Sequence, residues 1–390
     1  MQNNFAVTSS PHLRAKSTSR QIMMEVCLAL APAGVASVIL FGLQAAILIA
    51  ICVASCVLAE YGWQKLTKQK VTVGDWSAVV TGLLLAYNLP ATAPWWMAVI
   101  DSVIAIVLVK QLFGGIGSNF MNPALTARAV LFISWSSLMS ASTPAPLLPS
   151  IGSISLDVIS GATPLNTLNA GSIEGLNLMN LLLGTHGGML GETCAAAIIL
   201  GGLYLCVRGI ADWRIPASFI GTVFVCYLLM ALPSLSVSFA FEISDIVASV
   251  VVAVITVLFN VLLYKKLGGK FIIPTVTLVV AICAGLTIRT GESFSFTALA
   301  DKAEYALYHV LSGGLLLGAF FMATDYATSP ITRTGRVVFG IGCGLLLFVI
   351  RAFANYPEGC SFAILFMNVA TPMIDRFTAP RPFGEVKKHG

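Results

Sequence analysis

The chain has 390 residues, of which 57% are hydrophobic and only 10% are charged, and its mean hydropathy is +0.89. Because an ordinary soluble domain carries roughly 25% charged residues, this composition predicts a polytopic membrane protein and excludes a large soluble domain. The formal net charge is +5, but the 22 Lys and Arg residues stand singly between apolar runs. Nucleic-acid binding needs a clustered basic stripe, so nucleic acid is excluded as a partner.

Apolar runs long enough to cross a bilayer, roughly 20 residues each, recur along the chain and predict an all-α fold with about twelve transmembrane helices. The first run is too long for a signal-peptide core and is expected to remain as a span. The expected spans are 22–41, 43–62, 75–90, 95–113, 121–138, 190–209, 215–232, 244–264, 271–288, 305–324, 336–353 and 360–376.

The orientation of these spans follows from the basic residues, which are retained on the cytoplasmic side of a membrane. With the N-terminus inside, 18 of the 22 Lys and Arg residues fall in cytoplasmic segments, and only Arg289 and Lys302 fall outside. Both termini are therefore predicted to be cytoplasmic. The predicted regions are an N-terminal segment 1–21, a first helical half 22–138, an extracytoplasmic loop 139–189, a second helical half 190–376 and a C-terminal tail 377–390.

Two short sequence words recur and predict an inverted repeat. Gly82-Leu-Leu-Leu followed by Ala91-Thr92 matches Gly314-Leu-Leu-Leu followed by Ala323-Thr324, and Phe120-Met-Asn122-x-Ala124 matches Phe366-Met-Asn368-x-Ala370. In the predicted topology the first copies run outward and the second copies run inward. Repeats of this kind place binding sites at their interface, where helices are interrupted. Chance matching of small apolar words is the alternative.

The long loop contains the segment Asp157-Val-Ile-Ser160-Gly161-Ala162-Thr163-Pro164. Its composition alone indicates a turn. The segment also resembles the acceptor sequence at which a periplasmic flavin transferase esterifies the phosphate of FMN to a threonine hydroxyl. In that interpretation Thr163 supplies the oxygen, Gly161 and Ala162 leave room for the transferase, and Pro164 keeps the segment extended.

Further motifs support the same resemblance. They are Ser9-Ser-Pro-His12, Leu89-Pro-x-x-Ala-Pro-Trp-Trp96, Lys110-Gln-Leu-Phe-Gly-Gly-Ile-Gly117, Asn122-Pro123, Gly318-Ala-Phe-Phe-Met-Ala-Thr-Asp325, Tyr356-Pro-x-Gly359 and Pro380-Arg-Pro-Phe-Gly384. Together they resemble the D subunits of Rnf ion-translocating oxidoreductases, a family related to the B subunit of the sodium-pumping NADH:quinone reductase. The resemblance covers Ser9 to about Leu232 and resumes from Tyr305 to Gly384, without a recognised counterpart for 233–300. The family typically has ten spans.

The resemblance implies membership of a translocating oxidoreductase complex that passes electrons between ferredoxin and NAD, coupled to Na⁺ or H⁺ movement across a bacterial inner membrane. It implies covalent FMN at Thr163, with Asp157, Ser160, Gly161 and Ala162 as the recognition motif, and a second, noncovalent flavin, riboflavin or FMN, nearer the cytoplasm. The implied partners are the Rnf A, B, C, E and G subunits and the flavin transferase. The nine cysteines do not form the close cluster that a zinc or iron–sulfur site needs, so no metal site is expected.

Ionisable residues inside spans are functional candidates by default. Arg128 follows the helix break at Asn122-Pro123, and these residues are expected to bind the noncovalent flavin, unless Arg128 forms a structural ion pair. Asp101 either lines an ion path or bonds a neighbouring helix. Weaker candidates are Glu192, Arg351 and Glu358 at the outer edge; Asp325 and Asp375 are expected to be solvated loop charges, and Asn119, Asn122 and Asn368 to begin or interrupt helices.

Two other classes of protein remain open. Twelve spans with broken helices also describe a secondary transporter, or a channel of the urea-transporter kind, without a redox role. A structural scaffold for the other members of a complex is the third possibility. Only the redox protein needs the acceptor hydroxyl of Thr163, so covalently bound flavin distinguishes it from both.

Overall fold

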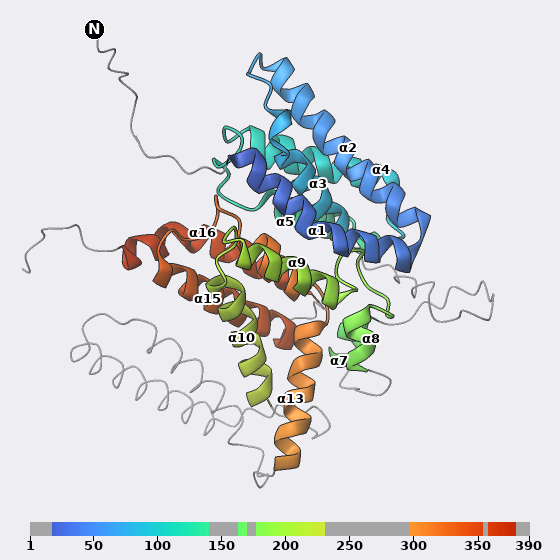
Figure 1. Cartoon of the computed structure of the whole chain (residues 1–390), viewed down its shortest axis with the longest axis vertical. Coiled ribbons are helices and arrows are strands. Elements are labelled where there is room, and N and C mark those ends of the chain that lie inside the picture. Colours follow the sequence, from blue (N-terminus) through green and yellow to red (C-terminus); the bar gives the residue numbers. More distant parts are fainter. Residues whose placement is uncertain (1–17, 140–162, 170–176, 231–295, 354–357, 380–390) are drawn as a thin grey trace, which may run out of the picture.

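The computed structural model describes residues 18–139, 163–169, 177–230, 296–353 and 358–379. Every regular element in these ranges is a helix, apart from one isolated bridge between Pro90 and Met189. The helices of the first half gather in the upper part of Figure 1, and those of the second half lie below them. This confirms the all-α class expected from the composition.

The first half contains five main helices and a turn of 3₁₀ helix. Its elements are α1 (Ser19–Phe41), α2 (Leu43–Leu66), η1 (Val73–Asp75), α3 (Ser77–Tyr87), α4 (Trp95–Val103) with the π-helix η2 (Ile104–Gln111), α5 (Pro123–Ser134) and α6 (Ser136–Met139). Two short helices follow in the described parts of the 139–189 loop, α7 (Pro164–Asn169) and α8 (Leu178–Leu183).

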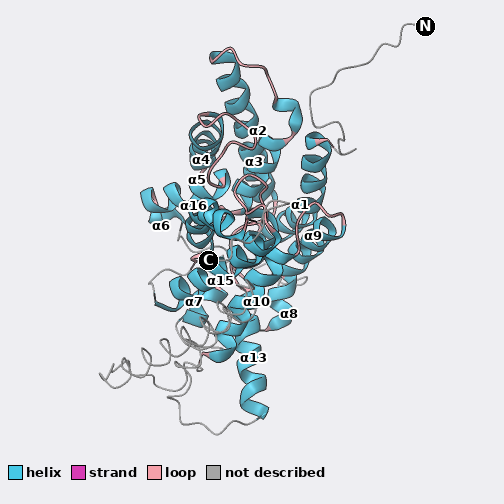
Figure 2. Cartoon of the chain, turned by 90° about the vertical axis from the view of Figure 1, so that its left-hand side faces the viewer, coloured by secondary structure: helices cyan, strands magenta, loops and turns pink. Residues whose placement is uncertain are grey.

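The second half repeats the mixture of long and interrupted helices. Its elements are α9 (Ala195–Val207), α10 (Arg214–Leu229), α13 (Phe296–Leu311), α14 (Leu315–Leu317) with the π-helix η4 (Gly318–Met322), α15 (Arg333–Phe353) and α16 (Cys360–Thr378). In both views α13 extends to the end of the molecule opposite the turn that joins α2 to α3, and α7 and α8 lie in the half nearer α13 (Figure 2).

Local sequence explains where several helices begin and end. Thr18 and Gln21 form a capping box at the start of α1, which satisfies two backbone N–H groups that the first turn leaves free. Gly42, with φ of 75°, separates α1 from α2, a conformation that glycine adopts without steric cost. Asn122 caps α5 through the N–H groups of the next residues, and Pro123 occupies the first helical position, where a missing N–H costs nothing.

Three helices are long and apolar enough to cross a membrane by themselves, namely α1, α2 and α15. The expected span 305–324 is not one straight helix: α13 and α14 are joined at Ser312–Gly314, and the chain bends there by 69°. Four shorter apolar helices, α3, α5, α9 and α10, fall within further expected spans. The expected spans 244–264 and 271–288 lie outside the described residues.

In each half, one described helix packs against two others. In the first half α2 packs against α3 and α4, and in the second half α10 packs against α13 and α15. The two halves meet where α1 lies along α9 and where α5 contacts α16. Neither repeated motif occupies equivalent places. Gly82 lies inside α3 whereas Gly314 precedes α14, and Asn122 caps α5 whereas Asn368 lies inside α16. The expectation that Asn368 begins or interrupts a helix is therefore wrong.

Candidate functional site

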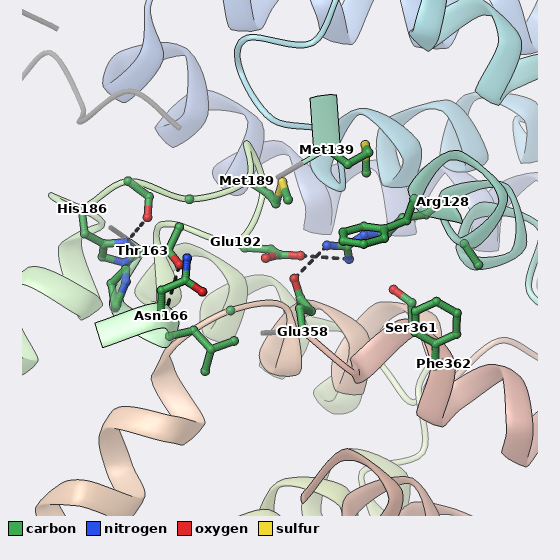
Figure 3. A pocket seen from close by; sticks show the side chains of 17 residues that line it. Arg128, Met139, Thr163, Asn166, His186, Met189, Glu192, Glu358, Ser361 and Phe362 are labelled. Atoms are coloured by element: carbon green, nitrogen blue, oxygen red, sulfur yellow. Dashed lines mark hydrogen bonds and ion pairs between the residues drawn. The ribbon is translucent and has the colours of Figure 1, made fainter. Parts of the chain in front are cut away.

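A pocket whose wall combines apolar side chains with several ionisable ones, which we call the Thr163 pocket, lies between α5, the segment before α7, the turn before α9 and the segment before α16 (Figure 3). Its volume is about 110 Å³. Residues that carry its chemistry are Arg128, Thr163, His186, Glu192 and Glu358. The structure thus brings together Arg128 and Thr163, the main candidates of the sequence analysis. It adds Glu192 and Glu358, which that analysis treated as weaker candidates.

Arg128 is buried, and its guanidinium donates to three side chains from distant parts of the chain. Nη1 lies 2.6 Å from Oδ1 of Asn88 and 3.1 Å from Oε1 of Glu192, and Nη2 lies 2.8 Å from Oε2 of Glu358. Both acids point toward the guanidinium in Figure 3. The expectation that an arginine inside a span must be paired is confirmed, and these partners are protein groups.

The break between α13 and α14 is stabilised by one charge at each side. Arg351 donates to the carbonyl oxygens of His309 and Ser312 at the end of α13, where backbone acceptors lack helical partners. Glu358 accepts from the N–H of Gly314 at 2.6 Å, where α14 begins. A cation at the carboxyl end of a helix and an anion at an amino end both complement the helix dipole, so the bend has an electrostatic basis.

Thr163 is half-buried and directly precedes α7. Its carbonyl oxygen accepts from the N–H groups of Asn166 and Thr167, and the Asn166 N–H also approaches its hydroxyl at 3.4 Å. The hydroxyl oxygen therefore lies at a pocket wall. Asp157, Ser160, Gly161 and Ala162, the rest of the expected acceptor motif, lie outside the described residues.

His186 forms part of the same wall. Its Nδ1 lies 3.1 Å from the carbonyl oxygen of Gly187, and its Nε2 has no hydrogen-bond partner among the described residues. Burial lowers the pKa of this imidazole, and the backbone contacts offset that effect only in part. A neutral ring that donates from Nδ1 presents a free acceptor at Nε2. The sequence analysis missed this residue, since a lone histidine in a loop carries no distinguishing spacing.

A second pocket, of about 340 Å³, lies at the start of α5 and includes Asn119, Asn122, Thr324, Asp325 and Lys110. Asn122 donates to the carbonyl oxygen of Met322 at 3.1 Å, so the beginning of α5 meets the end of η4. Arg128 lies six residues further along α5, about 9 Å at 1.5 Å per residue, and belongs to the Thr163 pocket instead. The two residues expected to share a flavin site therefore line different pockets.

Asp325 is half-buried at the wall of this second pocket and accepts from Asn119 at 3.5 Å and from Thr328 at 3.4 Å. The expectation that it is an ordinary solvated loop charge is wrong. Asp375 accepts from the N–H of Ile331 at 3.0 Å and fixes the turn before α15.

A buried ion pair beside the second pocket was not expected. Lys110 donates to both oxygens of Glu60, at 3.1 and 2.9 Å, and to the Ser77 hydroxyl at 2.6 Å. Gln111 also donates to Glu60. The sequence analysis counts Lys110, at the end of the expected span 95–113, among the 18 basic residues on the cytoplasmic side. The signal that could have revealed the pair is an acid and a base at the same predicted end of two neighbouring spans.

Asp101 is fully buried on α4, and neither carboxylate oxygen has a hydrogen-bond partner among the described residues. It lines neither of these two pockets. The expected hydrogen bond from Asp101 to a neighbouring helix is not seen in the described part of the chain. Its role in an ion path stays a prediction.

These features define a class: a multi-spanning helical membrane protein whose interrupted helices border pockets lined by both apolar and ionisable side chains. The NQR2, RnfD, RnfE family model matches residues 6–244 and 234–384. The chain therefore belongs to the NQR2, RnfD, RnfE family. The matched region includes residues 233–300, which the sequence analysis left outside the resemblance.

Curated relatives match over nearly the whole chain. The D subunit of the Na⁺-translocating ferredoxin:NAD⁺ oxidoreductase complex of Acetobacterium woodii is 40% identical over 387 residues, which cover 98% of this chain and 96% of that protein. Its counterpart in the proton-translocating complex of Clostridium ljungdahlii is 33% identical, covering 98% and 97%. Its counterpart in the ion-translocating oxidoreductase complex of Stutzerimonas stutzeri is 34% identical, covering 95% and 93%.

Proposed function

We propose that this chain is the membrane-embedded D subunit of an Rnf-type ferredoxin:NAD⁺ oxidoreductase complex and relays electrons through FMN attached to Thr163, coupled to Na⁺ or H⁺ translocation. The observation that carries the proposal is the position of the Thr163 hydroxyl at the wall of a pocket that also contains Arg128. The near full-length similarity to D subunits of such complexes supports it. The A, B, C, E and G subunits are its expected partners in a bacterial inner membrane.

The residues of the Thr163 pocket fit an attached flavin nucleotide. A threonine hydroxyl can form the phosphoester bond that a periplasmic flavin transferase would make. Nε2 of His186 can accept from a ring N–H, and a guanidinium favours an electron-rich ligand in a buried site. When bound, the flavin supplies one- and two-electron chemistry, while this chain holds the nucleotide and excludes water.

The second pocket is the better candidate for a noncovalent flavin. It is the larger of the two, and its wall combines the amides of Asn119 and Asn122 with apolar side chains such as Leu84 and Phe321. Ligand sites for aromatic molecules are typically apolar with a few polar groups that fix orientation. It lies on the side of Lys110, which the predicted topology assigns to the cytoplasm.

Replacing Thr163 by Ala tests the attachment site. The chain is expressed with its complex and the flavin transferase, and the denatured protein is examined on a gel under ultraviolet light. We expect a fluorescent band for the native chain, no band for Thr163→Ala, and a retained band for the matched control Thr167→Ala, whose hydroxyl bonds the backbone within α7.

Fluorescence that persists in Thr163→Ala would move the attachment elsewhere. A native chain without covalent flavin, expressed with the transferase, would instead favour the transporter or channel alternative.

A further inference from the structure

Two carboxylates share one guanidinium at the floor of the Thr163 pocket. Glu192 and Glu358 come from different loops, and both reach Arg128, at 3.1 and 2.8 Å. A Cβ placed on Gly314 would lie 2.4 Å from Oε1 of Glu358 and 2.5 Å from Oε1 of Glu192. Since both oxygens lie so close to one point, the two carboxyl groups are near neighbours.

Glu192 lies in the turn before α9 and Glu358 in the segment before α16, and their side chains are 4% and 13% exposed. Two like charges at short range in a buried site cannot both ionise without a large cost. The guanidinium of Arg128 carries one positive charge and can balance the charge of only one of the two carboxylates. The remaining negative charge would be buried without a counter-ion, which proteins avoid by protonation.

Arg351 on α15 is a second cation near the pair, but among the described residues it forms no ion pair with either glutamate, and its electrostatic effect on Glu358 is smaller than that of Arg128. Its hydrogens are donated to the carbonyl oxygens of His309 and Ser312, so it offsets the second negative charge only in part. Asp101 on α4 interacts electrostatically with Arg128 and adds a further acid, while Cys360 on α16 and the neutral His186 carry no positive charge. The two glutamates together with Arg128 are therefore closest to neutral when they hold one proton.

We propose that Glu192 and Glu358 form a two-carboxylate proton site, the Glu192–Glu358 pair, which binds one additional proton when the Thr163 pocket gains negative charge and releases it when that charge leaves. This inference rests on the proposed function for the source of the charge, an electron that arrives at the group on Thr163. Only an O–H bond forms and breaks at the pair, and the proton comes from water in the pocket and returns to it. The pair itself is neither oxidised nor reduced.

Infrared spectroscopy of the purified complex tests the resting state of the pair. The oxidised native protein should show a protonated carboxyl band that shifts in D₂O and loses intensity as the pH is raised, as expected for two carboxyl groups that share a proton. Glu192→Gln and Glu358→Gln should each remove it. Glu60→Gln is the matched control, since Glu60 is equally buried but has Lys110 as its own cation.

Proton uptake on reduction tests the coupling. A pH indicator in weakly buffered solution measures the protons bound per covalent flavin reduced, and Glu192→Gln should lower that number by up to about one proton while Glu60→Gln leaves it unchanged. Uptake in Glu192→Gln and Glu358→Gln equal to that of the native complex would overturn the coupling. Absence of the carboxyl band throughout the pH range would overturn the shared proton.

The proposed function and the Glu192–Glu358 proton site can be tested separately. A chain without covalent flavin would remove the proposed function, but the carboxyl band can still be measured in the Thr163→Ala variant, which lacks the attachment hydroxyl and retains both glutamates and Arg128. Because Glu192→Gln and Glu358→Gln change different loops, a folding defect in one of them leaves the other as the test.

Discussion

At the scale of single residues, His309 is an unusual choice for a buried position. It is 1% exposed, its ring stacks on Tyr227 with centroids 3.6 Å apart, and neither ring nitrogen has a hydrogen-bond partner among the described residues. A buried polar group without a partner costs stability, whereas an apolar group of the same shape does not.

Replacing His309 by Phe should therefore leave the thermal unfolding temperature unchanged or raise it, because the ring stacking on Tyr227 is retained and the two unpaired nitrogens are removed. The control His309→Ala removes the ring and should destabilise the protein by about 3–5 kcal/mol, as for other aromatic truncations in cores. Thermal unfolding of the purified complex measures both. A large loss of stability in His309→Phe would mean that the imidazole nitrogens are satisfied by bound water or by another member of the complex.

At the scale of elements, close approach between helices depends on particular glycines. A Cβ on Gly201 of α9 would lie 2.0 Å from the carbonyl oxygen of Ala29 on α1, whereas a Cβ on Gly221 of α10 would meet nothing within 4 Å among the described residues. Small residues at helix contacts allow backbones to approach closely in membranes. The α1–α9 contact joins the two halves of the molecule. The absence of a side chain at Gly201 therefore allows the two halves to pack closely.

The pair Gly201→Ala and Gly221→Ala separates this packing effect from helix propensity. Alanine in place of glycine favours a helix by about 1 kcal/mol, so Gly221→Ala should stabilise the protein slightly. Gly201→Ala carries the same gain but forces α1 and α9 apart, with an expected net loss of about 1–3 kcal/mol. The measurement is thermal stability in detergent; equal stability of the two variants would show that α1 and α9 separate without cost.

At the scale of the whole molecule, the orientation in the membrane connects the two pockets to two compartments. The basic residues predict that the turn after α2 is cytoplasmic and that the 139–189 loop is outside. Thr163 must be outside for a periplasmic transferase to reach it. The position of the second pocket beside Lys110 would then be near the cytoplasm.

Reporter fusions after Lys68, Gly171 and Gly390 test this orientation. We expect cytoplasmic reporter activity at Lys68 and Gly390 and external activity at Gly171, since 18 basic residues lie on one side and 2 on the other in the predicted topology. A cytoplasmic result at Gly171 would place Thr163 on the wrong side for the transferase, and the attachment proposal would fall with the topology.

The sequence by itself determined those properties that depend on neighbouring residues. Apolar length predicted the membrane helices and the Asn122-Pro123 pair predicted the start of α5, because each signal is contained within a few consecutive turns of chain. The orientation that the charge distribution indicates stays a prediction. The need for a partner to Arg128 also followed from the cost of an unpaired guanidinium in lipid. The inverted repeat that the repeated motifs suggested stays a prediction, because Gly82 and Gly314, like Asn122 and Asn368, take different local positions in the described residues.

Only the tertiary structure decided which groups meet. The two acidic partners of Arg128 lie 64 and 230 residues away along the chain, in Glu192 and Glu358. The bend between α13 and α14 depends on Arg351 and Glu358 at its two sides, and the second pocket forms where the end of η4 meets the start of α5. Contacts of this kind arise from the packing of whole helices, and no local pattern of residues specifies which distant side chain will fill the space beside a buried charge.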